Sequence, residues 1–88
     1  MAQLGLDPDQ MTRLAKTMKA EAEKIESAAK SVGGQLRSVW WRGKDADDFK
    51  GRWDGQHSKA IHEAAQLLRD ASDHITRQVK DQRQASGA

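Results

Sequence analysis

Histidines and aspartates are the side chains of this sequence with the clearest capacity for chemistry. His57 and His62 could bind a metal ion through imidazole nitrogens, but they stand five residues apart. Two ligands on one helical face need a spacing of three or four. The acidic cluster lacks the regular oxygen-ligand series and closing glutamate of a calcium-binding loop; it comprises Asp45, Asp47, Asp48 and Asp54. We therefore predict no metal site, no cofactor and no catalytic residues, and we expect the protein not to be an enzyme.

Ordinary structural roles also explain these histidines and aspartates. His57 falls on a predicted apolar stripe, so we interpret it as a packed or edge histidine, and His62 and His74 as solvent-facing. The aspartates stand where a helix would begin, and carboxylates in a first turn complement the helix dipole. We interpret them as helix-capping residues.

Basic residues also gather in the middle of the chain and could in principle bind phosphate. Acids are interleaved with them, and a helix-turn-helix DNA reader is normally a compact bundle of at least three shorter helices. We predict no nucleic-acid binding and no small-molecule substrate, and an ordinary solvated surface for this basic set, which comprises Arg37, Arg42, Lys44, Lys50 and Arg52.

Composition sets the boundaries of the fold. The chain has 88 residues, no cysteine, a net charge of +2 and a charged fraction of 32%. A chain this short forms one domain with a small core, and no disulfide can staple it. No stretch is long and apolar enough to cross a membrane, and the beginning of the sequence does not resemble a signal peptide. Few β-branched residues and a high content of Ala, Gln and charged residues predict an all-α fold.

The first helix is expected over residues 8–39. Asp7 is a good N-cap, Pro8 suits the first helical position, and Gln10 stands where a capping box places it. Apolar residues then recur at steps of three or four along one face. Gly33 and Gly34 interrupt this pattern and allow a bend or a close approach of another helix.

A second helix is expected over residues 45–80, after a turn at 40–44 and before a flexible tail at 81–88. Its apolar positions again follow steps of three and four, and they are Phe49, Trp53, His57, Ala60 or Ile61, Ala64, Leu68, Ala71, Ile75 and Val79. Two helices of this length joined by a short turn make an antiparallel hairpin.

A single hairpin leaves part of its apolar seam in water. We therefore expect two hairpins to pair into a four-helix bundle with coiled-coil-like packing. The residues predicted to form the dimer seam are Leu14, Met18, Ile25, Val32, Leu36, Ile61, Leu68 and Ile75.

All the large aromatic residues lie between positions 40 and 53. Each can bury roughly 150–250 Å², so they hold much of the potential contact energy of the chain. One interpretation is that they close the open end of the hairpin. The other is that Trp40, Phe49 and Trp53, with the turn, contact a partner.

The turn motif Trp41, Arg42, Gly43 between two long amphipathic helices resembles the WXG family, small helical-hairpin substrates of bacterial type VII secretion. The resemblance covers nearly the whole chain. It implies export as a folded homodimer or heterodimer, without a cleaved signal peptide, from the cytoplasm to the outside of the cell. It also implies recognition of the turn by the secretion ATPase, and it places Trp41 and Gly43 near the tail of the partner chain. Physically, Gly43 would allow a tight turn where a side chain would obstruct.

Family pairs commonly carry a Tyr-x-x-x-Asp/Glu export signal after the second helix of one chain, and this sequence has no tyrosine. The missing signal favours a heterodimer whose other chain supplies it. Two further interpretations stay open, because the chain could be a cytosolic targeting partner of a larger type VII toxin, or a coiled-coil adaptor unrelated to secretion.

Overall fold

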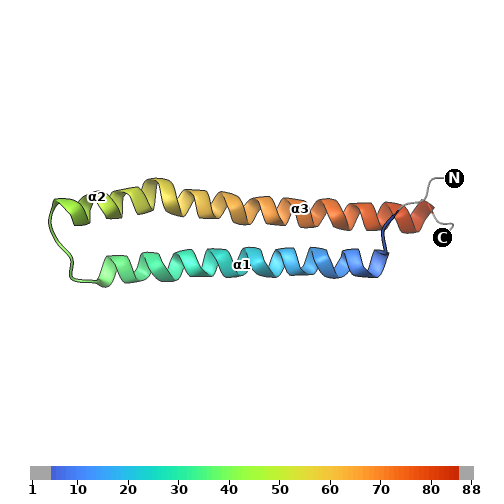
Figure 1. The fold of residues 1–88 in the computed structure, drawn as a ribbon, viewed down its shortest axis with the longest axis horizontal. Coiled ribbons are helices and arrows are strands. Elements are labelled where there is room, and N and C mark those ends of the chain that lie inside the picture. Colours follow the sequence, from blue (N-terminus) through green and yellow to red (C-terminus); the bar gives the residue numbers. More distant parts are fainter. Residues whose placement is uncertain (1–4, 86–88) are drawn as a thin grey trace.

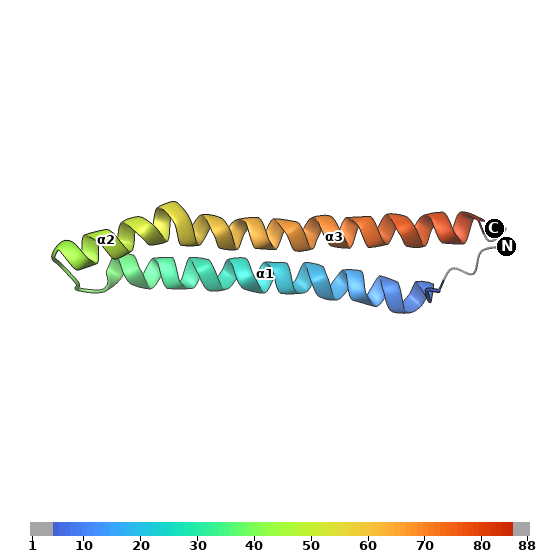
Figure 2. The same cartoon turned by 45° about the horizontal axis from the view of Figure 1, so that its top comes forward.

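The protein is an all-α antiparallel hairpin in the computed structural model, which describes residues 5–85. One arm is helix α1 (Pro8–Ser38); the other is continuous helix made of α2 (Lys44–Arg52), a π-helical turn η1 (Trp53–His57) and α3 (Ser58–Ala85). Figures 1 and 2 show the two arms side by side, joined by one loop at the far end. The molecule measures 66 × 16 × 15 Å. The predicted helical hairpin is therefore confirmed, and residues 5–85 contain no strand.

Helix α1 begins where its capping signals stand. The Asp7 carboxylate accepts hydrogen bonds from the backbone N–H groups of Asp9 (2.9 Å) and Gln10 (3.0 Å). These bonds satisfy two donors that have no partner inside the helix. The helix ends at Ser38, one residue before the expected boundary, because Val39 is extended (φ −70°, ψ 141°).

The second arm begins at Lys44, and its N-cap is Gly43, which has no side chain to cap with. Among the described residues, no side chain forms a capping hydrogen bond at this end of α2. Asp45 and Asp47 lie in the first turn, as predicted, where they face the positive end of the helix dipole. Asp48 instead forms an ion pair with Lys44 at 3.3 Å.

The π-helical turn changes which side chains of the second arm face α1. The Ser58 N–H donates to the carbonyl of Trp53, five residues back, so one extra residue is accommodated in this turn. His57, predicted to pack on the apolar stripe, is exposed, and Ser58 is half-buried instead. The prediction was wrong because a regular helical period was assumed across the turn. Gly55, which lies inside it, loosens the helix locally.

The second arm also runs further than the sequence suggested. Helix α3 continues to Ala85, not to residue 80, so the predicted flexible tail is wrong for residues 81–85, and its last residues lie outside those described. One ion pair links this last turn to α1, because an Arg83 Nη2 atom lies 3.0 Å from an Asp9 carboxylate oxygen. Gln82 of the same turn is half-buried. The few apolar residues of this segment gave no sign of the ion pair.

Small residues form the seam between α1 and α3. Ala22, Ala65 and Ser72 are fully buried, and Ala15 is 3% exposed. The Ser72 hydroxyl donates a hydrogen bond of 2.7 Å to the carbonyl of Ala15, so the one buried polar side chain of the seam is satisfied. Short side chains allow the two helix axes to approach closely.

The seam runs one residue away from the line that the sequence predicted on the second arm. Ala64 is exposed and Ala71 is half-buried, whereas Ala65 and Ser72 are buried. Both lines have a helical period, so periodicity alone does not choose between them. The predicted line also contains Leu68 and Ile75, whose larger side chains would hold the helices apart, so close packing favours the line through Ala65 and Ser72.

Candidate partner-binding surface

The large apolar side chains of the hairpin lie beside the small-residue seam and remain partly exposed. We define the apolar stripe as the eight predicted seam residues Leu14, Met18, Ile25, Val32, Leu36, Ile61, Leu68 and Ile75. Leu14 and Val32 each expose 42% of their surface, and the other six are half-buried. Within residues 5–85 the largest buried apolar side chain is Val79. The hairpin therefore buries its small apolar residues and leaves its large ones in contact with water.

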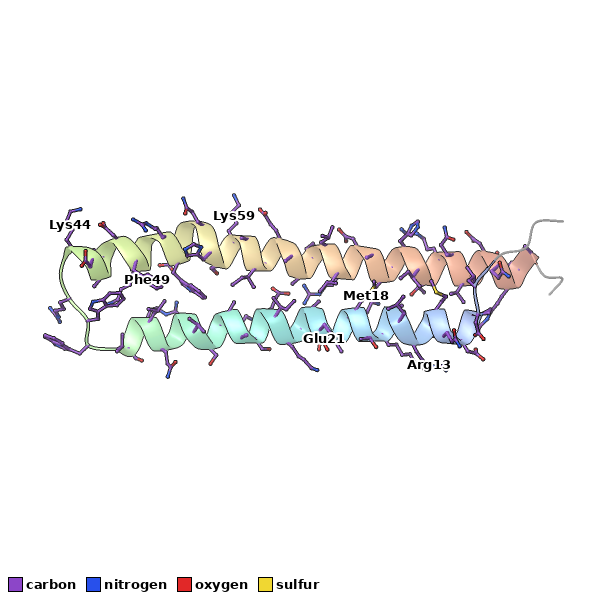
Figure 3. All side chains as sticks on the ribbon, viewed as in Figure 1. Arg13, Met18, Glu21, Lys44, Phe49 and Lys59 are labelled. Carbon is purple, nitrogen blue, oxygen red and sulfur yellow. The ribbon has the colours of Figure 1, made fainter. Side chains whose placement is uncertain are left out.

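Most of the stripe lies along one side of the seam. Met18, Ile25 and Val32 recur every seven residues on α1, and Ile61, Leu68 and Ile75 do so on α3. A seven-residue repeat keeps side chains on nearly one face of a helix. In Figure 3, Met18 points toward α3 whereas Arg13 points away from it. The result is two parallel rows of apolar side chains that share one surface.

Charged residues occupy the other side of the seam, one position after the stripe residues. Glu26 follows Ile25 and Arg69 follows Leu68, and a step of one residue rotates a helical side chain by about 100°. Glu26 pairs with Arg69 across the two arms. The Glu26 Oε2 atom also accepts a hydrogen bond of 2.9 Å from His62 Nδ1, which carries the hydrogen because an ionised carboxylate only accepts.

This cluster perturbs one titrating group. Hydrogen bonds from His62 and then Arg69 hold the pKa of the Glu26 carboxyl below its usual value, against the opposing effect of partial burial. Lys19 and Asp73 form a further pair between the arms at 3.4 Å. His62, predicted to face solvent without a role, is exposed but joins the two helices through Glu26. The position of His62 directly after the stripe residue Ile61 was the sequence signal that could have predicted this contact.

The turn presents its tryptophans unequally. Trp40 is 82% exposed, whereas Trp41 is 37% exposed and packs on Phe49 with ring centroids 5.6 Å apart. Lys50 Nζ donates a hydrogen bond of 3.2 Å to the Trp41 carbonyl, which ties the turn to α2. The structure thus brings together Trp41 and Phe49, two of the predicted recognition residues, and leaves Trp40 free of that contact.

Gly43 and Arg42 complete the turn motif. Gly43 has φ 119° and ψ 179°, and no other described residue has a positive φ. A Cβ atom built on Gly43 would meet nothing within 4 Å, so the expectation that a side chain would obstruct the turn is wrong. Glycine is required here by its backbone conformation, which L-residues rarely adopt. Arg42 is exposed and forms no ion pair among the described residues.

Trp53 lies apart from the Trp41 and Phe49 pair, over helix α1. Gly33 is buried, and a Cβ atom there would lie 3.3 Å from Trp53 Nε1. Of the two roles that the sequence allowed for Gly33, a bend or a close helix approach, the structure shows a close approach. The group that approaches Gly33 is the Trp53 indole of the second arm. The ring of Trp53 also lies 6.4 Å from that of His57. Trp53 packs within its own hairpin and is half-buried.

The described part of the chain holds no group of three or more His, Cys, Asp or Glu side chains placed to bind a metal ion. None of its helices has both the length and the apolar character that a membrane crossing requires. What the arrangement can do chemically is therefore to present an uncharged apolar surface, an aromatic turn and a row of ion pairs. Comparisons of the chain with models of protein families, with curated proteins and with solved structures found no match.

Proposed function

We propose that this chain is a non-enzymatic interaction protein that pairs through its apolar stripe with a second helical hairpin, completing a four-helix bundle. The proposal rests on one observation, which is that the small and the large apolar residues occupy different places in the hairpin. Small side chains fill the seam within the chain, and the eight large side chains of the stripe stay partly in water. An apolar surface of this kind on a small domain is typical of a partner interface.

Burial of the stripe would also supply stability that the hairpin lacks. Covering apolar surface contributes about 25 cal/mol per Å², and each stripe residue retains surface to cover. An 88-residue chain has little core of its own and no cysteine to crosslink. A second hairpin laid along the stripe would place large side chains between the two layers, as in other four-helix bundles.

The turn extends this proposal to type VII secretion. Trp41, Arg42 and Gly43 resemble the WXG motif in sequence, and they occupy the loop between two long antiparallel arms. We propose that the chain is a substrate or co-secreted partner of such a system and that the secretion ATPase recognises the turn. Because the chain has no tyrosine, a heterodimer whose partner carries the tail signal is the preferred form.

Pairing is tested by the mass of the purified chain in solution, alone and with a candidate partner, measured by light scattering over a concentration series. We expect Val32→Glu to abolish pairing, because it places a charge in the stripe. The matched control is Leu67→Glu, since Leu67 is 70% exposed and lies outside the stripe. Equal effects of the two substitutions, or a folded monomer at every concentration with every partner, would exclude the stripe as the interface.

Export is tested separately, by following the protein in the culture medium with and without the secretion ATPase. We expect export only when the ATPase is present. We also expect Trp41→Ala to reduce pairing or export more than helicity, because Trp41 lies in the loop, is partly exposed and packs on Phe49 of α2. Loss of helicity in parallel with export would make Trp41 a purely structural residue. If the location of the protein does not depend on the ATPase, the result would contradict the secretion proposal and favour a coiled-coil adaptor unrelated to secretion.

A further inference from the structure

A groove of about 380 Å³ lies between α1 and the π-helical turn, away from the Trp41 turn. Its walls include Lys30, Gly33 and Arg37 of α1 and Trp53 and Asp54 of η1. The size suits a few atoms of a ligand or one side chain of a peptide. One stripe residue, Ile61, also lines the groove, so the groove adjoins the edge of the proposed pairing surface.

Two hydrogen-bond donors converge on the floor of the groove. The floor at Gly33 has no side chain, and the position of its absent Cβ lies 3.3 Å from Trp53 Nε1 and 3.4 Å from Arg37 Nη1. An indole N–H and a guanidinium therefore approach the same point from the two arms. Both groups only donate hydrogen bonds.

Neither donor is used within the described chain. In residues 5–85, the Trp53 indole N–H and the Arg37 guanidinium have no hydrogen-bonding or ion-pair partner, and Lys30 at the wall has none either. Glu26 also lines the groove, but its two carboxylate oxygens are engaged by His62 and Arg69. The chain thus leaves donors and positive charge in the groove without an acceptor.

We propose that this groove binds the carboxylate of an acidic side chain carried by a peptide segment. The carboxylate accepts from Trp53 Nε1 and from the Arg37 guanidinium above Gly33, and Lys30 adds positive charge at the edge. Charge-assisted bonds of this kind are stronger than neutral ones, and guanidinium geometry matches a carboxylate. Of the acidic residues that line the groove, only Asp54 has no ion-pair partner among the described residues, and its negative charge repels the same carboxylate.

Arg37 and Asp54 carry opposite charges, so substituting one or the other should change the affinity for a carboxylate in opposite directions. The full chain is labelled with ¹⁵N, and the Trp53 indole resonance is identified by its loss in Trp53→Phe. The blocked peptide Gly-Glu-Glu-Gly is then titrated, with Gly-Gln-Gln-Gly and inorganic phosphate as comparison ligands. We expect a saturable shift of this resonance with the glutamate peptide only.

Substitution then assigns the binding to named groups. Arg37→Gln weakens binding by about tenfold or more, because it removes a charge-assisted bond. Asp54→Asn tightens binding by up to about fivefold, because it removes a like charge. Arg13→Gln, at an exposed arginine of α1 outside both the groove and the turn, leaves the affinity unchanged. Circular dichroism verifies that each variant keeps its helicity.

Three results would overturn the proposal. The first is the absence of a saturable shift at millimolar peptide, and the second is an equal shift with the glutamine peptide. The third is a response to phosphate without a response to the glutamate peptide, which would make the groove a phosphate site. Because every arm uses the Trp53 resonance, failure of hairpin pairing would not produce any of these results.

Discussion

The buried line of the second arm can be tested with two neighbouring alanines. Ala65 is fully buried against α1, whereas Ala64 is exposed. Replacing Ala65 with leucine adds three carbon atoms at a point of close helix approach. Overpacking of this kind costs typically about 1–3 kcal/mol, while the same change at an exposed helical position stays within about 0.5 kcal/mol.

The assay is urea or thermal unfolding followed by circular dichroism at one fixed protein concentration, because pairing makes stability depend on concentration. We expect Ala65→Leu to lower Tm by at least about 4 °C, since 1 kcal/mol corresponds to about 4–8 °C in a domain of this size. Ala64→Leu serves as the matched control. A destabilised Ala64→Leu beside an unchanged Ala65→Leu would refute the small-residue seam and restore the line predicted from periodicity.

Three further predictions concern single contacts and use the same unfolding assay. Ser72→Ala should cost about 0.5–1.5 kcal/mol, because it removes the 2.7 Å hydrogen bond across the seam while the Ala15 carbonyl keeps its bond within α1. Gly43→Ala should cost about 1–3 kcal/mol at φ 119°, whereas Gly34→Ala, with open space at its Cβ, should stabilise by about 0.5–1 kcal/mol; equal effects would contradict the backbone argument. The lowered pKa of Glu26 means that its pairs stabilise the fold above the unfolded pKa of about 4.3. That contribution is lost as the pH falls through the lowered folded pKa, so Glu26→Gln should flatten the acid limb of stability, and Glu23→Gln should not.

The apolar stripe was anticipated from sequence better than the interior of the hairpin. Met18 and Ile25 were placed on one apolar face by their steps of three or four residues, and both are half-buried. Ala15 and Ser72, which are joined by a hydrogen bond across the seam, were missed because Ala15 lies beside the larger Leu14 and a serine does not mark a core position. Glu26 and His62 were read as surface residues, and their pairing depends on which faces of two distant segments meet.

The Trp53 groove could not be predicted at all. It needs Gly33 opposite the π-helical turn, and the extra residue in that turn alters the direction of every side chain before it. Nothing in a regular helical period indicates such an insertion. Gly55 was recognised as a weak point, but weakness alone does not specify a π-helical turn rather than a bend.

Sequence by itself determined that the chain is helical, where α1 starts, and that it turns back on itself near the tryptophans. These properties follow from local chemistry, namely the Asp7 cap, the helical period of apolar residues and the glycine at position 43. Only the tertiary structure decided which line of each helix is buried. That choice depends on how closely two helices can pack, which selects Ala65 and Ser72 and leaves the larger apolar side chains partly exposed.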